Sequence, residues 1–438
     1  MYQAFKTFKY LCFLTLISTF FSNKNIYSHN QLCNSGYHEP LVKITETDNG
    51  LDLESFLYGK LSLDKQFSNE NALIEIINNS YFKRLFNINQ YGLSVYGSHK
   101  KTLFNNYAKI DAYSRGDHSI NMAIILYKNN RPLKEIICAL LHDATHTKFS
   151  HLGDTLIRNI LCNKELKTDP IIAEMSKFIT NEKDVTAIQD MIFEWFFDKT
   201  GFTETLKKYK IEVKDILTEN NSAVKQKSPN ICADNLEYTL TGCFLAGDLN
   251  KEEVNQIIKS LIIDDKGNWL FQENAQEIAK NFGVIAMMFD LKNAAAYWNP
   301  ILNYYGAILL EKVIEKNIIA IEDLIFAPNL TDKDIWEKIK SYTNKNKDEE
   351  LSYLIERIKS PKDYYDKSYD ELANGLFCIK PKLRFINPYI ENQDYLTKIN
   401  EEFNYLYSFY SDKYSSEGWT GIKIKDDKYT LPNPIPGY

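Results

Sequence analysis

The sequence lacks an excess of positive charge. Its 52 lysine and arginine residues are outnumbered by 58 aspartate and glutamate residues, so the formal net charge is −6 at pH 7. Broad, charge-driven binding of nucleic acid requires a strongly positive surface. That class of function is therefore excluded, and any phosphate chemistry must depend on a local cluster of cations and metal.

Internal repeats and low-complexity tracts are absent as well. Apolar residues make up 44% of the chain, and Tyr (29) and Phe (25) are plentiful. This composition is typical of a globular protein and argues against a disordered one. The chain can bury a sizeable core, and its length leaves room for about two to three domains.

The apolar run near the N-terminus, residues 10–21, is too short for a comfortable membrane span. It follows Lys6 and Lys9 and precedes a polar stretch, which is typical of a signal peptide over residues 1–28. No clean small-x-small cleavage site is present, so a buried N-terminal helix is the alternative. We expect an exported protein, secreted or periplasmic and without a stable membrane span, if the signal is cleaved. Otherwise we expect a cytoplasmic one.

Cysteine is scarce, and six of the seven cysteines lie beyond residue 28. An even number permits disulfides in an oxidising compartment. Cys138 and Cys232, however, fall in predicted helices and are predicted to be buried thiols. The cysteines therefore leave the compartment open.

Helical periodicity dominates the chain, and strand patterns are few. Short-strand alternation occurs at residues 56–63, after a polar lead-in at 29–54. Beyond residue 348 the periodicity weakens, and the Tyr- and Lys-rich C-terminus is predicted to be an appended, mixed region with a tail over 331–438. The fold class predicted is mainly α. Predicted helical segments are 71–79, 118–127, 133–141, most of 172–261, and 272–318.

The densest group of ligand-type side chains follows the predicted helix 133–141, which starts behind Pro132. The helix stops at His142 and Asp143, with His146 one turn further on. At about 100° per residue, His146 points between the directions of His142 and Asp143. Imidazole beside carboxylate is typical of a metal site, but a His-Asp pair alone is also a common helix-end hydrogen bond. Further ligands must come from elsewhere in the chain.

His118 heads one predicted helix, and Asp234 lies in another. The order His118, His142-Asp143, Asp234 resembles the H…HD…D signature of the HD-domain metal-dependent phosphohydrolases. Local matches are most similar to the dGTPase-like deoxynucleoside triphosphate triphosphohydrolases, over about residues 55–330. The matches are Tyr81-Phe82-Lys83-Arg84-Leu85…Gln90-Tyr91-Gly92 to F-x-R-L…Q-x-G, Arg115…His118-Ser119 to R-x-x-H-S, His142 to His151 to H-D-x-G-H-x-x-F-S-H followed by Asp154, and Asp234…Tyr238 to D-x-x-x-Y.

The resemblance implies an HD-domain helical core over 55–330 and a site of defined composition. A divalent ion (Fe, Mn, Zn, Ni or Mg) suits two imidazoles and two carboxylates. Tyr238 and Gln90 are equally consistent with helix packing, and His151 with a structural hydrogen bond. The implied roles are metal binding by His118, His142, Asp143 and Asp234; catalysis by His146, Asp154 and His151; and substrate binding by Arg115 (phosphate), Gln90 (nucleoside), Tyr238 (sugar) and Lys292 (a retained cation).

The activity implied is hydrolysis of a deoxynucleoside triphosphate, dGTP-like, to nucleoside and triphosphate. The alternatives are an HD-type phosphodiesterase or phosphomonoesterase on another nucleotide, and a non-catalytic metal- or nucleotide-binding module. The intact ligand set argues against the module, and an export signal argues mildly against control of cytosolic nucleotide pools. The partners expected are a nucleotide substrate and a second copy of the chain in a homo-oligomer.

The sequence also departs from the family pattern. Thr145 stands where the family has Gly, and Thr147-Lys148 stands where it has Gly-Pro. A β-branched residue there would be strained if the backbone needed a positive φ. No histidine follows His151, so a further family histidine is absent, and Ala294-Ala295-Ala296 replaces bulkier polar residues. These departures affect substrate contacts more than metal ligands.

Overall fold

The computed structural model describes residues 41–97, 113–162, 169–179, 188–217, 221–296, 298–360, 365–368, 377–380, 383–414, 420–424 and 435–436. The predicted signal peptide, residues 1–28, lies outside the described residues, so export stays a prediction. Among the described helices, none combines the length and apolar character that a membrane crossing requires.

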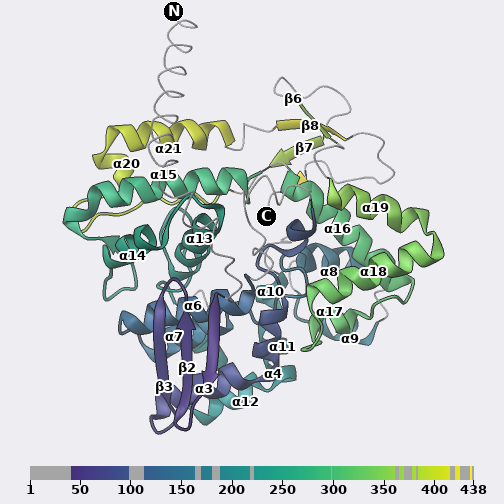
Figure 1. Cartoon of the computed structure of the whole chain (residues 1–438), viewed down its shortest axis with the longest axis horizontal. Helices are drawn as coiled ribbons and strands as arrows, with labels where there is room; N and C mark the ends of the chain where they lie inside the picture. Colours follow the sequence, from purple (N-terminus) through teal and green to yellow (C-terminus); the bar gives the residue numbers. More distant parts are fainter. Residues whose placement is uncertain are drawn as a thin grey trace, which may run out of the picture. The chain divides into compact units, whose positions relative to one another are not determined.

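The fold is mainly α, as predicted, and its sheets are small (Figure 1). Short 3-10 turns at Arg84–Asn87, Gly92–Tyr96, Val213–Ile216 and Glu273–Ala275 connect some of the helices. The α-helices are α3 (Ser68–Asn78), α4 (Ser80–Lys83), α6 (Arg115–Lys128), α7 (Leu133–Leu141), α8 (Leu152–Cys162), α9 (Pro170–Met175), α10 (Ile188–Met191), α11 (Phe193–Thr200), α12 (Phe202–Lys208), α13 (Ala233–Ala246), α14 (Lys251–Lys259), α15 (Gln276–Lys292), α16 (Trp298–Glu315), α17 (Ile321–Ile325), α18 (Asp332–Asn346), α19 (Glu349–Lys359), α20 (Leu396–Ile399) and α21 (Glu401–Tyr414).

The first sheet is an antiparallel meander in the order β1-β2-β3, with Leu53 opposite Ile44 on one side and Leu61 on the other. The strand predicted at 56–63 begins only at Gly59, because the Tyr58 N–H donates to Ser55 Oγ (3.1 Å) in a turn. β1 and most of β2 fall in the predicted polar lead-in, where we expected no strand. The strands are β1 (Val42–Glu46), β2 (Gly50–Ser55), β3 (Gly59–Asp64), the pair β4 (Leu261–Ile263) and β5 (Trp269–Phe271), and a sheet ordered β6-β8-β7-β9 from β6 (Tyr365–Ser368), β7 (Phe377–Lys380), β8 (Thr420–Ile424) and β9 (Ile435–Pro436).

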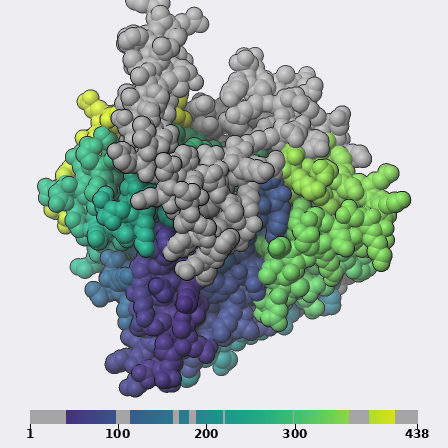
Figure 2. Space-filling model, viewed as in Figure 1, coloured from purple at the N-terminus to yellow at the C-terminus, as the bar shows by residue number. Residues whose placement is uncertain are grey.

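Helix α6 lies at the centre of the packing that positions the candidate site. It contacts α7, α13 and the β1-β2-β3 sheet, and the β1–β3 residues, purple in Figure 2, form part of the visible surface. The sequence predicted a start at His118, but the helix begins at Arg115, because Ser114 and Asp117 form a capping box. His118 is therefore held inside the first turn rather than at a fraying end.

The described helices beyond residue 331 pack against the helical core. Pro40 to Tyr438 belong to one compact unit, in which α16 contacts both α8 and α19, and α18 contacts α19. α20 and α21 lie against α15 (Figure 1). The predicted boundary at residue 330 stays a prediction. The packing does show that the region predicted to be appended contacts the elements around the site.

Candidate metal centre

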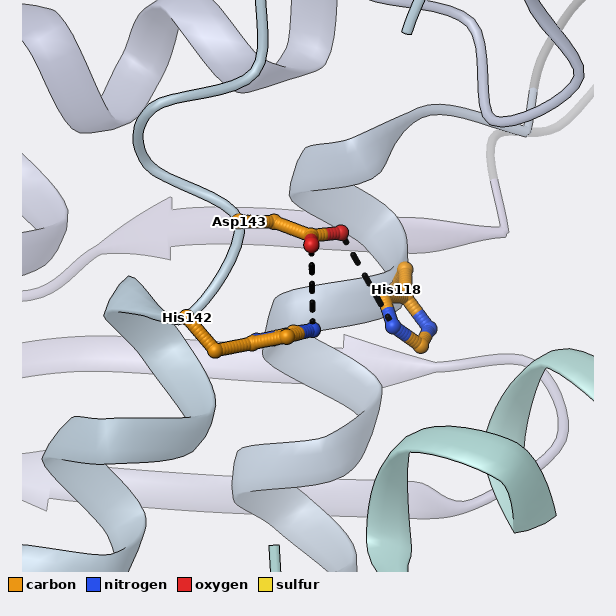
Figure 3. Close-up of side chains that lie close together, drawn as sticks. All are labelled: His118, His142 and Asp143. Atoms are coloured by element: carbon orange, nitrogen blue, oxygen red, sulfur yellow. Dashed lines mark ion pairs between the residues drawn. The ribbon is translucent and has the colours of Figure 1, made fainter. Parts of the chain in front are cut away.

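Three predicted ligands form a buried cluster. His118 comes from α6, while His142 and Asp143 directly follow α7, and one ligand atom from each lies within 4.8 Å of the others. Figure 3 shows both imidazoles directed at the Asp143 carboxylate. The His142 Nε2 atom is 3.3 Å from Asp143 Oδ1, and His118 Nε2 is 4.0 Å from Asp143 Oδ2.

The fourth predicted ligand, Asp234, lies in the first turn of α13, and its Oδ1 atom is 3.3 Å from His118 Nε2. This contact arises because α13 packs on α6. The structure thus brings together all four side chains that the sequence predicted as metal ligands. Their function as ligands stays a prediction.

The histidine tautomers favour a cation between these groups. His142 Nδ1 lies 2.8 Å from the Ala139 carbonyl, which can only accept, so Nδ1 carries the proton and Nε2 presents a lone pair. His118 Nδ1 bonds Glu237 Oε2 in the same way. Neither Nε2 has a hydrogen-bond partner among the described residues. Ring nitrogens this close to carboxylate oxygens are unfavourable unless a proton or a metal cation lies between them, so the residues present fit a divalent metal.

Glu237 belongs to the buried cluster, and sequence reasoning missed it. It is fully buried and bonds His118, and it also accepts hydrogen bonds from Tyr113 Oη (2.5 Å), Asn121 Nδ2 (2.8 Å) and Thr241 Oγ1 (2.6 Å). A carboxylate behind a ligating imidazole fixes the ring and raises its basicity. Its spacing from Asp234, three residues on a helix, was the readable signal that both side chains share one face.

The electrostatic field of the cluster attracts positive charge. Burial alone would lower the pKa of His118, but Glu237, Asp234 and Asp143 outweigh it and raise that pKa to about 10, so at neutral pH a proton lies on Nε2 unless a metal ion takes its place. Burial would raise the pKa of Asp143, yet Arg115 and the neighbouring histidines hold it well below its usual range. Burial would also raise the pKa of Asp234, but contact with His118 and the charge of His142 hold it low, so both carboxylates are ionised at neutral pH, as metal binding requires.

Arg115, the predicted phosphate ligand, is buried and contacts Asp143. Its Nη1 atom lies 2.7 Å from Asp143 Oδ2, and its Nε donates to Ser150 Oγ (3.0 Å). Two of its donor groups therefore orient the metal cluster and the following loop. A phosphate role for Arg115 stays a prediction.

The predicted catalytic residues lie beside the cluster. His146 Nε2 is 3.2 Å from Asp143 Oδ1, and the His146 and His151 rings are 4.8 Å apart. His151 Nδ1 is 3.8 Å from Asp154 Oδ2. Burial, followed by the charge on Arg115, lowers the pKa of His146 to about 4, while burial raises the pKa of Asp154 to about 8. At neutral pH the imidazole is thus uncharged and the Asp154 carboxyl protonated.

The residues predicted to bind substrate lie in different environments from one another. The Gln90 Oε1 atom is buried without a hydrogen-bond partner among the described residues, and Tyr238 is partly exposed. Lys292, at the end of α15, is half exposed and lies 3.7 Å from Asp248 Oδ1. The structure thus buries a polar group of Gln90 and gives Lys292 an acidic partner at the surface.

The loop after α7 lacks the backbone strain that a positive φ at Thr145 or Thr147 would cause. The helix ends at Leu141, and successive turns carry His146, so His146 is not on the helix itself. Among the residues of this loop, Phe149 (φ 64°) and Ser150 (φ 59°) adopt the left-handed conformation, whereas Thr145 and Thr147 do not. The substitutions at the family glycine positions therefore introduce no positive-φ strain.

Asp332, the first residue of α18, holds this loop. Its carboxylate accepts the backbone N–H of Asn89 (2.9 Å) and of Phe149 (3.0 Å), and it is buried. Asp332→Ala should lower the free energy of unfolding by about 2–5 kcal/mol, because two buried N–H groups lose their acceptor. Urea unfolding checks this. The matched control, Asp334→Ala, removes only the exposed cap of Thr331 and should cost about 1 kcal/mol; equal losses would contradict the prediction.

A second residue that the sequence did not reveal is Arg384. Its guanidinium lies 6.0 Å from the centre of the Tyr238 ring, and its backbone N–H donates to Asp290 Oδ2 (2.9 Å). Arg384 lies beyond the stretch that resembles the family, and no local pattern marked it. The contact depends on the packing of the segment after β7 against α13 and α15.

The chain was also compared with known proteins, and no protein-family model matches it. It is 23% identical over 346 residues to the uncharacterized protein YdhJ of Bacillus subtilis, covering 78% of this chain and 88% of that protein. It is 22% identical over 214 residues to a metal-dependent phosphohydrolase of Cordyceps militaris, covering 49% of this chain and 51% of that protein. A solved phosphohydrolase from Bacteroides thetaiotaomicron is 16% identical with a TM-score of 0.47, covering 74% of this chain and 80% of that one.

The phosphohydrolase relative and the buried His/Asp cluster support the HD superfamily of metal-dependent phosphohydrolases. The TM-score is too low for the structural similarity to add to this assignment. None of these three proteins is described as acting on deoxynucleoside triphosphates. The dGTPase-like branch therefore stays a prediction.

Proposed function

We propose that this chain is a metal-dependent phosphohydrolase that cleaves a nucleotide, with a deoxynucleoside triphosphate as its substrate and nucleoside and triphosphate as products. The observation that carries the phosphohydrolase part is the buried convergence of two imidazole Nε2 atoms, neither of which has a hydrogen-bond partner in the part of the chain that the structure describes, with the Asp143 and Asp234 carboxylates. The relative described as a metal-dependent phosphohydrolase also supports it.

His118, His142, Asp143 and Asp234 would hold the divalent ion, which is Fe, Mn, Zn, Ni or Mg. When bound, such an ion supplies Lewis acidity and charge neutralisation for phosphoryl chemistry. The chain's own contribution is to fix the ligands in advance. Glu237 orients His118 from one side, and Arg115 orients Asp143 from the other.

His146 would move the proton. Its imidazole is uncharged at neutral pH, because burial lowers its pKa to about 4, and so its unprotonated ring nitrogen can accept a proton at the cluster. Asp154, protonated at neutral pH and next to His151, would hold a proton at the far side of the histidine pair. At neutral pH His146 would therefore act as the proton acceptor and Asp154 as the proton donor.

The nucleotide part of the proposal rests on the family resemblance and on two side chains. The buried Gln90 Oε1 lacks a hydrogen-bond partner among the described residues and would accept from a nucleoside. The partly exposed Tyr238 ring, one helical turn from Asp234, would contact the sugar. Both groups suit a ligand that carries a nucleoside next to its phosphates.

The test is a substrate panel. Purified protein, loaded in turn with each of the five metals, is incubated with deoxynucleoside triphosphates, ribonucleoside triphosphates, monophosphates and cyclic nucleotides, and the products are identified. Release of nucleoside and triphosphate from a deoxynucleoside triphosphate is the expected result. If only monophosphates or cyclic nucleotides are turned over, the proposed substrate is wrong, but the protein is still a phosphohydrolase. No turnover with any metal, despite stoichiometric metal binding, would overturn the proposed function.

A further inference from the structure

We propose that Arg384, in the segment between β7 and α20, binds the anionic phosphate chain of the substrate. This inference rests on the proposed function and names a residue that recognises the substrate at the same site. It assigns a role in the site to a segment that the sequence placed in an appended region.

The first step concerns the side from which a substrate can reach the cluster. The side chains of His118, Asp143 and His146 are almost completely buried, with exposed fractions of 0%, 6% and 2%. Asp234 and His151 are more open, at 25% and 35%. The accessible edge of the metal centre is therefore the edge formed by Asp234 and His151.

Arg384 lies at this edge. Its guanidinium is 6.0 Å from the centre of the Tyr238 ring, and Tyr238 is one helical turn from Asp234. Arg384 is close enough to His151 to contribute to the lowering of its pKa, after burial and the charges of Arg115 and His146. Both Arg384 and Tyr238 are partly exposed. A phosphate that reached the metal cluster from this edge would pass the guanidinium.

The backbone that carries Arg384 is fixed in place. The Arg384 N–H donates to the buried Asp290 on α15 (2.9 Å). The next residue, Phe385, is buried, and its carbonyl accepts from Ser228 Oγ (2.6 Å) in the loop that leads to α13. Asn387 N donates to the Pro229 carbonyl (3.0 Å) in that loop. The segment is thus anchored to α15 and to the loop before α13, so less backbone entropy is lost on binding.

The other candidate cations at the site are already used by the protein. Arg115 bonds Asp143 and Ser150, Lys225 lies 3.5 Å from Asp190 Oδ2, and Lys292 lies against Asp248. Among the described residues, Arg384 has no carboxylate within ion-pair distance; its guanidinium lies 6.0 Å from the centre of the Tyr238 ring and interacts with Asp290 and Asp234 at longer range. A planar guanidinium presents a fork of donors that matches phosphate oxygens. Arg384 is therefore placed to supply a phosphate contact at the accessible edge of the site.

The experiment uses the full-length, metal-loaded protein and two variants, Arg384→Gln and Arg384→Lys. Binding of inorganic triphosphate is measured by calorimetry, and KM and kcat are measured on the best substrate of the panel. Arg384→Gln should weaken triphosphate binding and raise KM by about 10- to 100-fold, since a hydrogen-bonded charge is lost. Arg384→Lys should weaken triphosphate binding and raise KM by less than Arg384→Gln does, because lysine keeps the positive charge but lacks the fork of guanidinium donors. Metal content should stay unchanged.

The matched control is Lys398→Gln on α20, an exposed cation of the same C-terminal region that pairs with Asp394. It should leave triphosphate binding unchanged. Arg384→Gln protein that folds and binds triphosphate as tightly as the parent would overturn the inference and leave the proposed function standing. A parent protein that binds triphosphate through Arg384 but turns over no nucleotide would support the inference as an anion site and overturn the proposed function.

Discussion

Replacing His142 by Ala should strip the metal from the protein and abolish turnover. His142 Nε2 is a buried lone pair directed at the Asp143 carboxylate, and its orientation is set by the hydrogen bond from Nδ1 to Ala139. Loss of an outer-shell partner typically costs 10- to 100-fold in metal affinity, so loss of a ligand should cost more than about 100-fold. Metal content by elemental analysis and affinity by competition with a chelator measure this loss.

A second variant distinguishes the loss of a metal ligand from the loss of a residue that only orients a ligand. Glu237→Gln keeps an acceptor for His118 Nδ1 and the same volume, so it should weaken metal binding by about 10- to 100-fold without abolishing it. Thermal melting should show both variants folded when metal is absent. Stoichiometric metal retained by both His142→Ala and Asp234→Ala would show that these residues are not the ligands.

The part of the site that could be predicted from sequence is the part with local periodicity. The apolar spacing over 133–141 is strong, and α7 occupies the predicted residues, so His142 and Asp143 follow a buried helix as expected. Asp234 lies close to His118 only because α13 packs on α6, a contact that no local pattern reports. The proximity of Asp234 and His118 was predicted from the order of the family motif, because helical periodicity carries no information about contacts between helices.

Glu237 and Arg384 show why the rest was missed. Acidic residues on helices are usually exposed, and only the packing of α6 against α13 buries Glu237 behind His118. Arg384 follows a weakly patterned stretch, and it is placed by tertiary hydrogen bonds to Asp290 and to the loop before α13. The same applies to the strands in the predicted lead-in, where Leu51 and Leu53 are buried although their flanking sequence is polar.

The buried state of His146 has a consequence for stability that can be measured without substrate. Its pKa is lowered from 6.5 to about 4, first by burial and then by Arg115. The uncharged imidazole is favoured in the folded protein, so its stabilising contribution is complete above pH 6.5 and is lost as the pH falls toward 4. That difference corresponds to about 3 kcal/mol at about 1.36 kcal/mol per pH unit. His146→Ala protein should therefore lose less stability than the parent between pH 6.5 and 4.

Replacing His146 by Ala should also lower kcat by about 10²- to 10⁴-fold, the usual contribution of a positioned proton-transfer group. Metal content should be retained, because the four-ligand set does not include His146. KM should change little, since the imidazole is buried behind the open edge formed by Asp234 and His151. Single-turnover rates and elemental analysis on the same samples measure both quantities.

Added imidazole provides the decisive control for this variant. His146→Ala leaves a space beside Asp143 Oδ1, 3.2 Å from where Nε2 had been, and free imidazole bound there should restore part of the rate as a proton carrier. Restoration should depend on uncharged imidazole and so increase with pH through the pKa of imidazole in solution. Loss of metal from the His146→Ala protein would instead show that His146 is a metal ligand. Full activity without imidazole would assign the proton transfer to the His151–Asp154 pair, where burial keeps the Asp154 carboxyl protonated up to a pH of about 8.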